Sequence, residues 1–151
     1  MNLAELSHYQ TKAFEVSNQL SLANFIKDYL NNPANAMTLI PANIGISSSS
    51  VDSEIKEYNE LVLRRDRLTK GNDSNNPMVA DLDCSISVTR SSILYLTEDL
   101  ISTHELQLVE VEKQEKLLLG RIVAQSENER QLIFDLEHKR DSLQEIYKFL
   151  L

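Results

Sequence analysis

The chain has 151 residues, of which 42% are hydrophobic and 6% aromatic, with three glycines, three prolines and no tryptophan. A sheet protein with many tight turns needs more turn residues, so this composition predicts long helices with few connections. The net charge of −8 argues against nucleic acid or an anionic membrane surface as the main partner, because phosphate binding needs a basic face.

The first predicted element is a helix over about residues 3–30. Its apolar side chains recur at alternating spacings of three and four, the period of a helix that packs along a partner helix. This seam consists of Leu6, Tyr9, Ala13, Val16, Leu20 and Ala23. Pro33 predicts the end of the helix, because proline disfavours the helical conformation of the residue before it.

Residues 33–50 are expected to form an ordered extended connector. This stretch has no helical period and is interrupted by Pro41 and Gly45. An apolar loop is costly to leave in water, so we expect the connector to pack onto the helices through its aliphatic side chains. These side chains are Leu39, Ile40, Ile44 and Ile46.

A second helix is predicted over about residues 51–69, with an N-cap from the serines at 47–50. Its inward-facing residues are Ile55, Tyr58, Leu61, Val62 and Leu68. The short turn that follows, with Gly71, makes this helix an antiparallel neighbour of the next one. The basic cluster Arg64, Arg65, Arg67 and Lys70 either complements the dipole at the helix C-terminus or forms an anion site.

The third helix is predicted over residues 77–123, about 46 residues and roughly 70 Å. Asn76 and Pro77 are typical of a helix start, since proline at the first position loses only an N–H without a helical partner. The first seam is Val79, Leu82, Ile86, Ile93, Leu96 and Leu100, with Thr89 in the remaining slot. A displaced second seam follows at Leu108, Val111, Leu118 and Ile122. Cys84 lies between seam positions, which favours a semi-buried small residue over a reactive thiol.

A break is predicted at 124–126, where Ser126 and Glu129 fit a capping box that begins a fourth helix over residues 126–150. A continuous helix is the alternative. The fourth seam is Ile133, Leu136, Leu143, Tyr147 and Leu150, with Arg140 in one slot. Its dense charged face is either solvated or an inter-subunit contact.

Together these elements predict an all-α fold: one module over 1–151, an elongated antiparallel bundle or coiled coil of three to four helices. The expected packing residues are Leu6, Leu20, Ile55, Leu82, Ile86, Ile93, Leu96, Leu108, Ile133, Leu136 and Leu143. The pattern is already helical at the start, and it ends at 147–151 without a stop signal. We therefore expect the sequence to be a piece of a longer protein.

The sequence offers no obvious catalytic centre. None of the three histidines, His8, His104 and His138, pairs with another at metal-ligand spacing, and a single cysteine cannot build a thiolate zinc site. Neither a glycine-rich phosphate loop nor a Gly-x-Ser-x-Gly nucleophile motif is present. We expect no catalytic residue, no cofactor and no metal, and therefore not an enzyme.

Five stretches of the sequence carry motifs in a fixed order: 39–46, 57–68, 75–79, 127–130 and 143–151. Within them the motif positions are Pro41, Asn43, Gly45, Tyr58, Asn59, Asn76, Pro77, Glu129, Arg130, Tyr147 and Leu150. In this order the stretches resemble bacterial polysaccharide co-polymerases, most closely the extracytoplasmic region of capsular and exopolysaccharide tyrosine autokinases. The family usually has a proline where this chain has Gln125 and Ser126.

The resemblance implies a non-catalytic periplasmic module of an inner-membrane protein that self-associates and controls the chain length and export of capsular polysaccharide or exopolysaccharide. The full-length protein would then be a protein-tyrosine kinase, whose membrane helices and kinase domain lie outside this sequence. Its partners would be other copies and the polymerisation and export machinery, with membrane contact only through flanking helices. The alternative is a soluble coiled-coil scaffold or adaptor unrelated to polysaccharide export.

Overall fold

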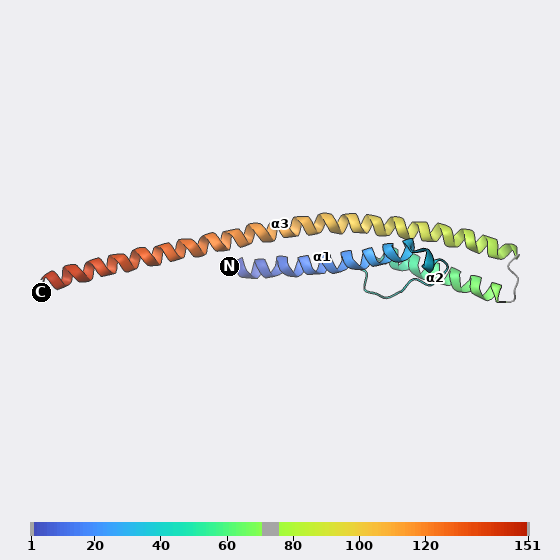
Figure 1. The fold of residues 1–151 in the computed structure, drawn as a ribbon, viewed down its shortest axis with the longest axis horizontal. Coiled ribbons are helices and arrows are strands. Elements are labelled where there is room, and N and C mark those ends of the chain that lie inside the picture. Colours follow the sequence, from blue (N-terminus) through green and yellow to red (C-terminus); the bar gives the residue numbers. More distant parts are fainter. Residues whose placement is uncertain (1, 71–75, 151) are drawn as a thin grey trace. The chain divides into compact units, whose positions relative to one another are not determined.

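The structure is a computed structural model that describes residues 2–70 and 76–150. The elements in chain order are helix α1 (Asn2–Asn31), a short 3-10 helix η1 (Pro33–Asn35), helix α2 (Ser49–Thr69) and helix α3 (Pro77–Leu150) (Figure 1). The described residues contain no strand, so the prediction of an all-α chain is confirmed. The sequence predicted one module, whereas the chain divides into two compact units: 13–109, and 1–12 together with 110–151.

Local sequence signals account for where the helices begin. The Ser48 hydroxyl caps α2 by accepting from the Val51 N–H at 3.3 Å, so α2 starts two residues earlier than predicted. The Asn76 side chain caps α3 by accepting from the Met78 N–H at 3.0 Å, and Pro77 occupies the first helical position. Both caps satisfy backbone donors that have no partner inside the helix.

Helix α3 is continuous over 74 residues, so the predicted break at 124–126 and the 46-residue length are both wrong. Ser126 lies inside the helix rather than at its start. A capping box stabilises a helix that begins there but does not end one already formed, and this segment contains no proline to interrupt the backbone hydrogen bonds. The alternative of a continuous helix is the one that the structure adopts.

Within the unit 13–109, α1 and α2 both pack along α3. Arg65 forms an ion pair with Asp83, and the Arg90 guanidinium lies 3.5 Å from the Tyr58 hydroxyl. The earlier residue of α2, Tyr58, thus contacts the later residue of α3, Arg90. The two helices are therefore antiparallel, as Figure 1 shows. Arg90 also donates to the Leu30 carbonyl at the end of α1.

The core of this unit comes from all three helices and from the connector between α1 and α2. Its buried members are Ala23, Ile26, Leu30, Ile40, Ile46, Val51, Ile55, Tyr58, Val62, Ile86, Ile93 and Ile101. The short helix η1 occupies 33–35, where the sequence predicted extended chain. In the rest of the connector Ile40 and Ile46 are buried and Ile44 is half-buried, whereas Leu39 is exposed and does not pack as expected.

The buried stripe of α3 follows the first predicted seam through Val79, Leu82, Ile86, Thr89 and Ile93. It then continues through Thr97 and Ile101, while Leu96 and Leu100 are only half-buried, so the seam shifts earlier than predicted. From Thr89 to Ile101 the stripe advances in three consecutive steps of four. Such steps follow a longer period than the 3.5-residue repeat and move the stripe around the helix.

Candidate interaction surface

The connector is held by two amide side chains that sequence reasoning did not single out as a pair. Asn59 of α2 binds the Ile40 backbone twice: its Oδ1 accepts from the N–H at 2.8 Å and its Nδ2 donates to the carbonyl at 2.9 Å. Gln19 of α1 does the same further along, donating to the Gly45 carbonyl at 3.0 Å and accepting from the Ser47 N–H at 2.8 Å. An amide side chain carries both a donor and an acceptor. Each of these two side chains therefore makes the pair of backbone hydrogen bonds that a neighbouring strand would make.

The backbone of the connector explains two of the motif residues. Gly45 has φ +93° and Asn43 has φ +58°, conformations that glycine adopts freely and asparagine tolerates better than most residues. Pro41 is exposed, and Tyr58 is fully buried. The motif residues in 41–59, together with the caps at Asn76 and Pro77, therefore shape the connector, the core and the start of α3.

A small open pocket lies between the connector and helices α2 and α3. Its lining includes Met37, Tyr58, Asp83 and Arg90. The charged groups there already have partners: Arg90 donates to the Leu30 carbonyl, and Asp83 pairs with Arg65. Arg65, one member of the basic cluster, is thus part of a helix–helix contact.

In the other unit, the buried stripe of α3 ends at Leu118, which is 5% exposed. Leu6 on α1 and Ile122 on α3 are half-buried, and so are Leu20 on α1 and Leu108 on α3 in the three-helix unit. Within this unit the start of α1 lies beside α3, and the rest of α3 has no other segment of the unit alongside it (Figure 1). Every residue from 123 to 150 is exposed.

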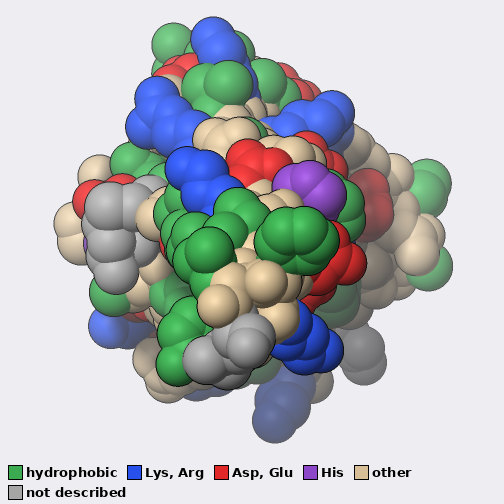
Figure 2. Space-filling view, turned by 90° about the vertical axis from the view of Figure 1, so that its left-hand side faces the viewer, with side chains coloured by type: hydrophobic (Ala, Val, Ile, Leu, Met, Phe, Trp, Pro, Cys, Tyr) green, Lys and Arg blue, Asp and Glu red, His purple; other side chains and the backbone are tan. Residues whose placement is uncertain are grey.

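The prediction that Ile133, Leu136 and Leu143 hold the bundle is therefore corrected. Leu143 is 66% exposed, and Ile133 and Leu136 are also exposed, because no described part of the chain packs against this stretch. The motif residues Glu129, Arg130, Tyr147 and Leu150 lie on the same exposed stretch. Figure 2, which views the molecule from the C-terminal end of α3, shows hydrophobic side chains there together with both basic and acidic ones.

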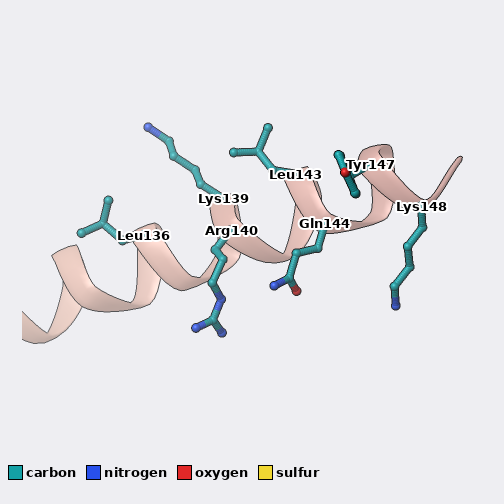
Figure 3. Close-up of a pocket in the computed structure, with 7 residues that line it drawn as sticks. All are labelled: Leu136, Lys139, Arg140, Leu143, Gln144, Tyr147 and Lys148. Carbon is teal, nitrogen blue, oxygen red and sulfur yellow. The ribbon is translucent and has the colours of Figure 1, made fainter. Parts of the chain in front are cut away.

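Figure 3 shows the last turns of this stretch in detail. Leu136, Leu143 and Tyr147 point to one side of α3, while Arg140, Gln144 and Lys148 point to the other. All the residues that line this surface come from α3 alone, so it is an open helix face rather than a cavity. It is suited to contact another helix rather than to enclose a small molecule.

The buried polar residues lie elsewhere on α3. Thr97 is fully buried, and its hydroxyl has no hydrogen-bond partner among the residues that the structure describes. His104 is buried, and its Nδ1 lies 3.0 Å from Gln107 Oε1, while its Nε2 has no partner in the same described part of the chain. Cys84 is exposed, which corrects its predicted semi-buried position. Cys84 occupies a position off the buried stripe, between Leu82 and Ile86.

No cluster of three or more histidine, cysteine, aspartate or glutamate side chains within residues 2–70 and 76–150 could hold a metal ion. Over the same described ranges, no helix is both long and apolar enough to cross a membrane. Comparison of the chain with protein-family models, with curated proteins and with solved structures finds no match in any of the three.

Proposed function

We propose that the chain is a non-catalytic assembly module that binds a partner helix through residues 119–150 of α3. One observation carries this proposal: the apolar seam of α3 does not stop where its burial stops. The seam is buried at Leu118 and half-buried at Ile122. After two successive steps of four, from 118 to 122 and from 122 to 126, an alternation of three and four runs through Ile133 and Leu136 to Leu150, and every described residue beyond Ile122 is exposed.

Physical chemistry favours a helical partner for this face. A helix in a protein gains most of its stability by packing an apolar face against other parts of the protein. This stretch of α3 has no such partner among the described residues. A contiguous apolar stripe on an exposed helix is typical of an interaction site. The spacing of 3.5 residues keeps the stripe facing a second helix over about 48 Å of helical rise.

A photo-crosslinking side chain introduced into the full-length chain tests the proposal. Placed at Leu136, on the apolar stripe, it is expected to give covalent products in cells. Placed at Ser142, which is also exposed but lies off the stripe, it is expected to give none. Absence of products from Leu136, with the protein present and helical, would show that the stripe contacts no partner.

A second candidate follows from the resemblance: a periplasmic module of a polysaccharide co-polymerase tyrosine kinase that controls the length and export of capsular polysaccharide or exopolysaccharide. The observation that favours it is local. Asn59, Asn43 and Gly45, which carry part of the resemblance, are the residues that give the connector its path and its hydrogen bonds. They therefore have a structural reason to occur together, as a family motif does.

The gene sequence around these residues tests the second candidate. It predicts a hydrophobic run of about 20 residues, enough to span a bilayer, on each side of the module, followed by a kinase domain. It also predicts that the natural protein fractionates with the inner membrane and that deleting it changes polymer length. If the natural protein lacks either hydrophobic run, this candidate is eliminated, and the proposed binding of a partner helix by α3 is unaffected.

A further inference from the structure

The exposed end of α3 carries one uninterrupted stripe, here called the α3 stripe. Its residues alternate in steps of three and four without a single exception: Leu119, Ile122, Ser126, Glu129, Ile133, Leu136, Arg140, Leu143, Tyr147 and Leu150. The stripe covers more than four heptads, enough to specify a two-helix coiled coil. Seven of its members are apolar or aromatic, and two, Glu129 and Arg140, are charged.

The two charged residues restrict how a second helix can lie on this stripe. A charge in a helix–helix seam is unfavourable unless an opposite charge faces it. If two copies paired in parallel and in register, Glu129 would face Glu129 of the second copy and Arg140 would face Arg140. That arrangement places two like-charge pairs in the seam.

An antiparallel arrangement removes both conflicts at once. When the second copy runs in the opposite direction about a two-fold axis between Phe134 and Asp135, Glu129 faces Arg140 of the second copy, and Arg140 faces its Glu129. Every other position of the stripe then also faces a stripe position of the second copy. Ile133 faces Leu136, Ser126 faces Leu143, Ile122 faces Tyr147 and Leu119 faces Leu150.

The charges beside the stripe agree with the same register. Arg130 and Glu137 occupy equivalent flanking positions, one residue after Glu129 and Leu136 respectively. In an antiparallel pair such positions on the two helices lie on the same side of the seam. Arg130 of each copy is then at nearly the same level as Glu137 of the other, which adds two opposite-charge pairs at the rim.

We infer that residues 119–150 of α3 bind the same residues of a second copy, antiparallel and in this register, to form a two-fold symmetric dimer. The inference rests on the proposed assembly function and names the partner. In a two-fold interface each unlike pair occurs twice, so one well-matched register is repeated at both ends of the contact. The Glu129–Arg140 pairs select this register over neighbouring ones, where a charge would face an apolar side chain.

Arg140 is available for such a pair in the single chain. Arg140 points away from Leu136 and Leu143 in Figure 3, and its Nη2 lies 3.4 Å from Asp141 Oδ1. Both side chains of that pair are about two-thirds exposed, at 64% and 65%, so the contact is weak and readily exchanged. A long arginine side chain can therefore turn to a glutamate of a second copy while its methylenes cover the apolar stripe.

Charge variants of the full chain test the inference by sedimentation equilibrium. Glu129→Arg and Arg140→Glu are each expected to weaken dimerisation about tenfold or more, because each creates two like-charge pairs in the seam. An equimolar mixture of the two variants is expected to restore association, and so is the double variant E129R/R140E. Glu127→Arg and Arg121→Glu, on exposed positions off the stripe, are the matched controls and are expected to dimerise like the unchanged chain.

Disulfide formation fixes the direction of the pair. In a Cys84→Ser background, Glu129→Cys and Arg140→Cys chains mixed together are expected to form a mixed disulfide dimer, and each chain alone is expected to form little. Homodimers from each chain alone would indicate a parallel pair and overturn the inference. A chain that stays monomeric to millimolar concentration would also overturn it, and crosslinking of Leu136 to a different protein would then leave the proposed assembly function standing.

Discussion

Asn59 holds Ile40 by both of its backbone groups, with bonds of 2.8 Å to the N–H and 2.9 Å to the carbonyl. This is the pattern of an extended strand bound to its neighbour, formed by one side chain of a helix. Ile40 is 2% exposed, so its backbone groups have little access to water as an alternative partner. The contact ties the connector to α2 and places Ile40 in the core.

Asn59→Ala is expected to destabilise the chain by about 2–3 kcal/mol, because it leaves a buried donor and acceptor unpaired. Asn18→Ala, the same change at an exposed position of α1, is expected to cost less than about 0.5 kcal/mol. Urea denaturation of both variants measures the difference. Equal free energies of unfolding would show that the connector does not depend on this contact.

The two halves of the α3 seam are expected to respond differently to the same truncation. Ile93→Ala removes a fully buried side chain and is expected to cost about 2–4 kcal/mol. Ile133→Ala removes an exposed one from the same helix and is expected to cost less than about 0.5 kcal/mol at concentrations where the chain is monomeric. Thermal unfolding monitored by circular dichroism distinguishes these outcomes. A similar loss from both would mean that Ile133 is covered within the single chain.

Thr97→Val is expected to stabilise the chain by about 1 kcal/mol. The change keeps the shape of the side chain and removes a buried hydroxyl that has no partner among the described residues. Thr103→Val, at an exposed position of α3, is the matched control and is expected to have little effect. Destabilisation by Thr97→Val would indicate that the hydroxyl makes a hydrogen bond, for example to a buried water.

Two glycines are expected to respond in opposite directions to alanine. A Cβ at Gly45 meets no atom within 4 Å, so Gly45→Ala is unfavourable only because of its φ of +93°, by about 1 kcal/mol. A Cβ at Gly120 also meets no atom within 4 Å, and its backbone is helical, so Gly120→Ala is expected to favour the helix by about 0.5–1 kcal/mol. The free energy of unfolding measures the first effect and helical circular dichroism the second. If Gly45→Ala stabilises the chain as Gly120→Ala does, Gly45 does not have the positive φ described here.

Local signals explain most of what the sequence predicted correctly. The helix class follows from the spacing of three and four, and the starts of α2 and α3 follow from the caps at Ser48 and Asn76. The shift to Thr97 and Ile101 was missed because Leu96 is more apolar than Thr97, and because Leu96 and Leu100 keep the alternation of three and four after Ile93. The predicted break at Ser126 was wrong because a capping pattern does not end a continuing helix.

Other features depend on contacts that no local pattern contains. Asn59 and Gln19 bind backbone groups distant in sequence, and an amide on a helix surface gives no sign of such a partner. The seam at 79–93 and the seam at 133–150 have the same period, yet the first is buried and the second exposed. Periodicity predicts that a helix has an apolar face, but not which segment covers that face.

Hydrogen exchange of the full chain tests most directly whether residues 119–150 of α3 are an interaction surface. Amides around 133–147 are expected to gain protection as the chain concentration rises, while those at 79–101 stay protected throughout. Amides at 133–147 that remain unprotected at every concentration, in isolation and in cell extract, with 79–101 still protected, would show that they are not.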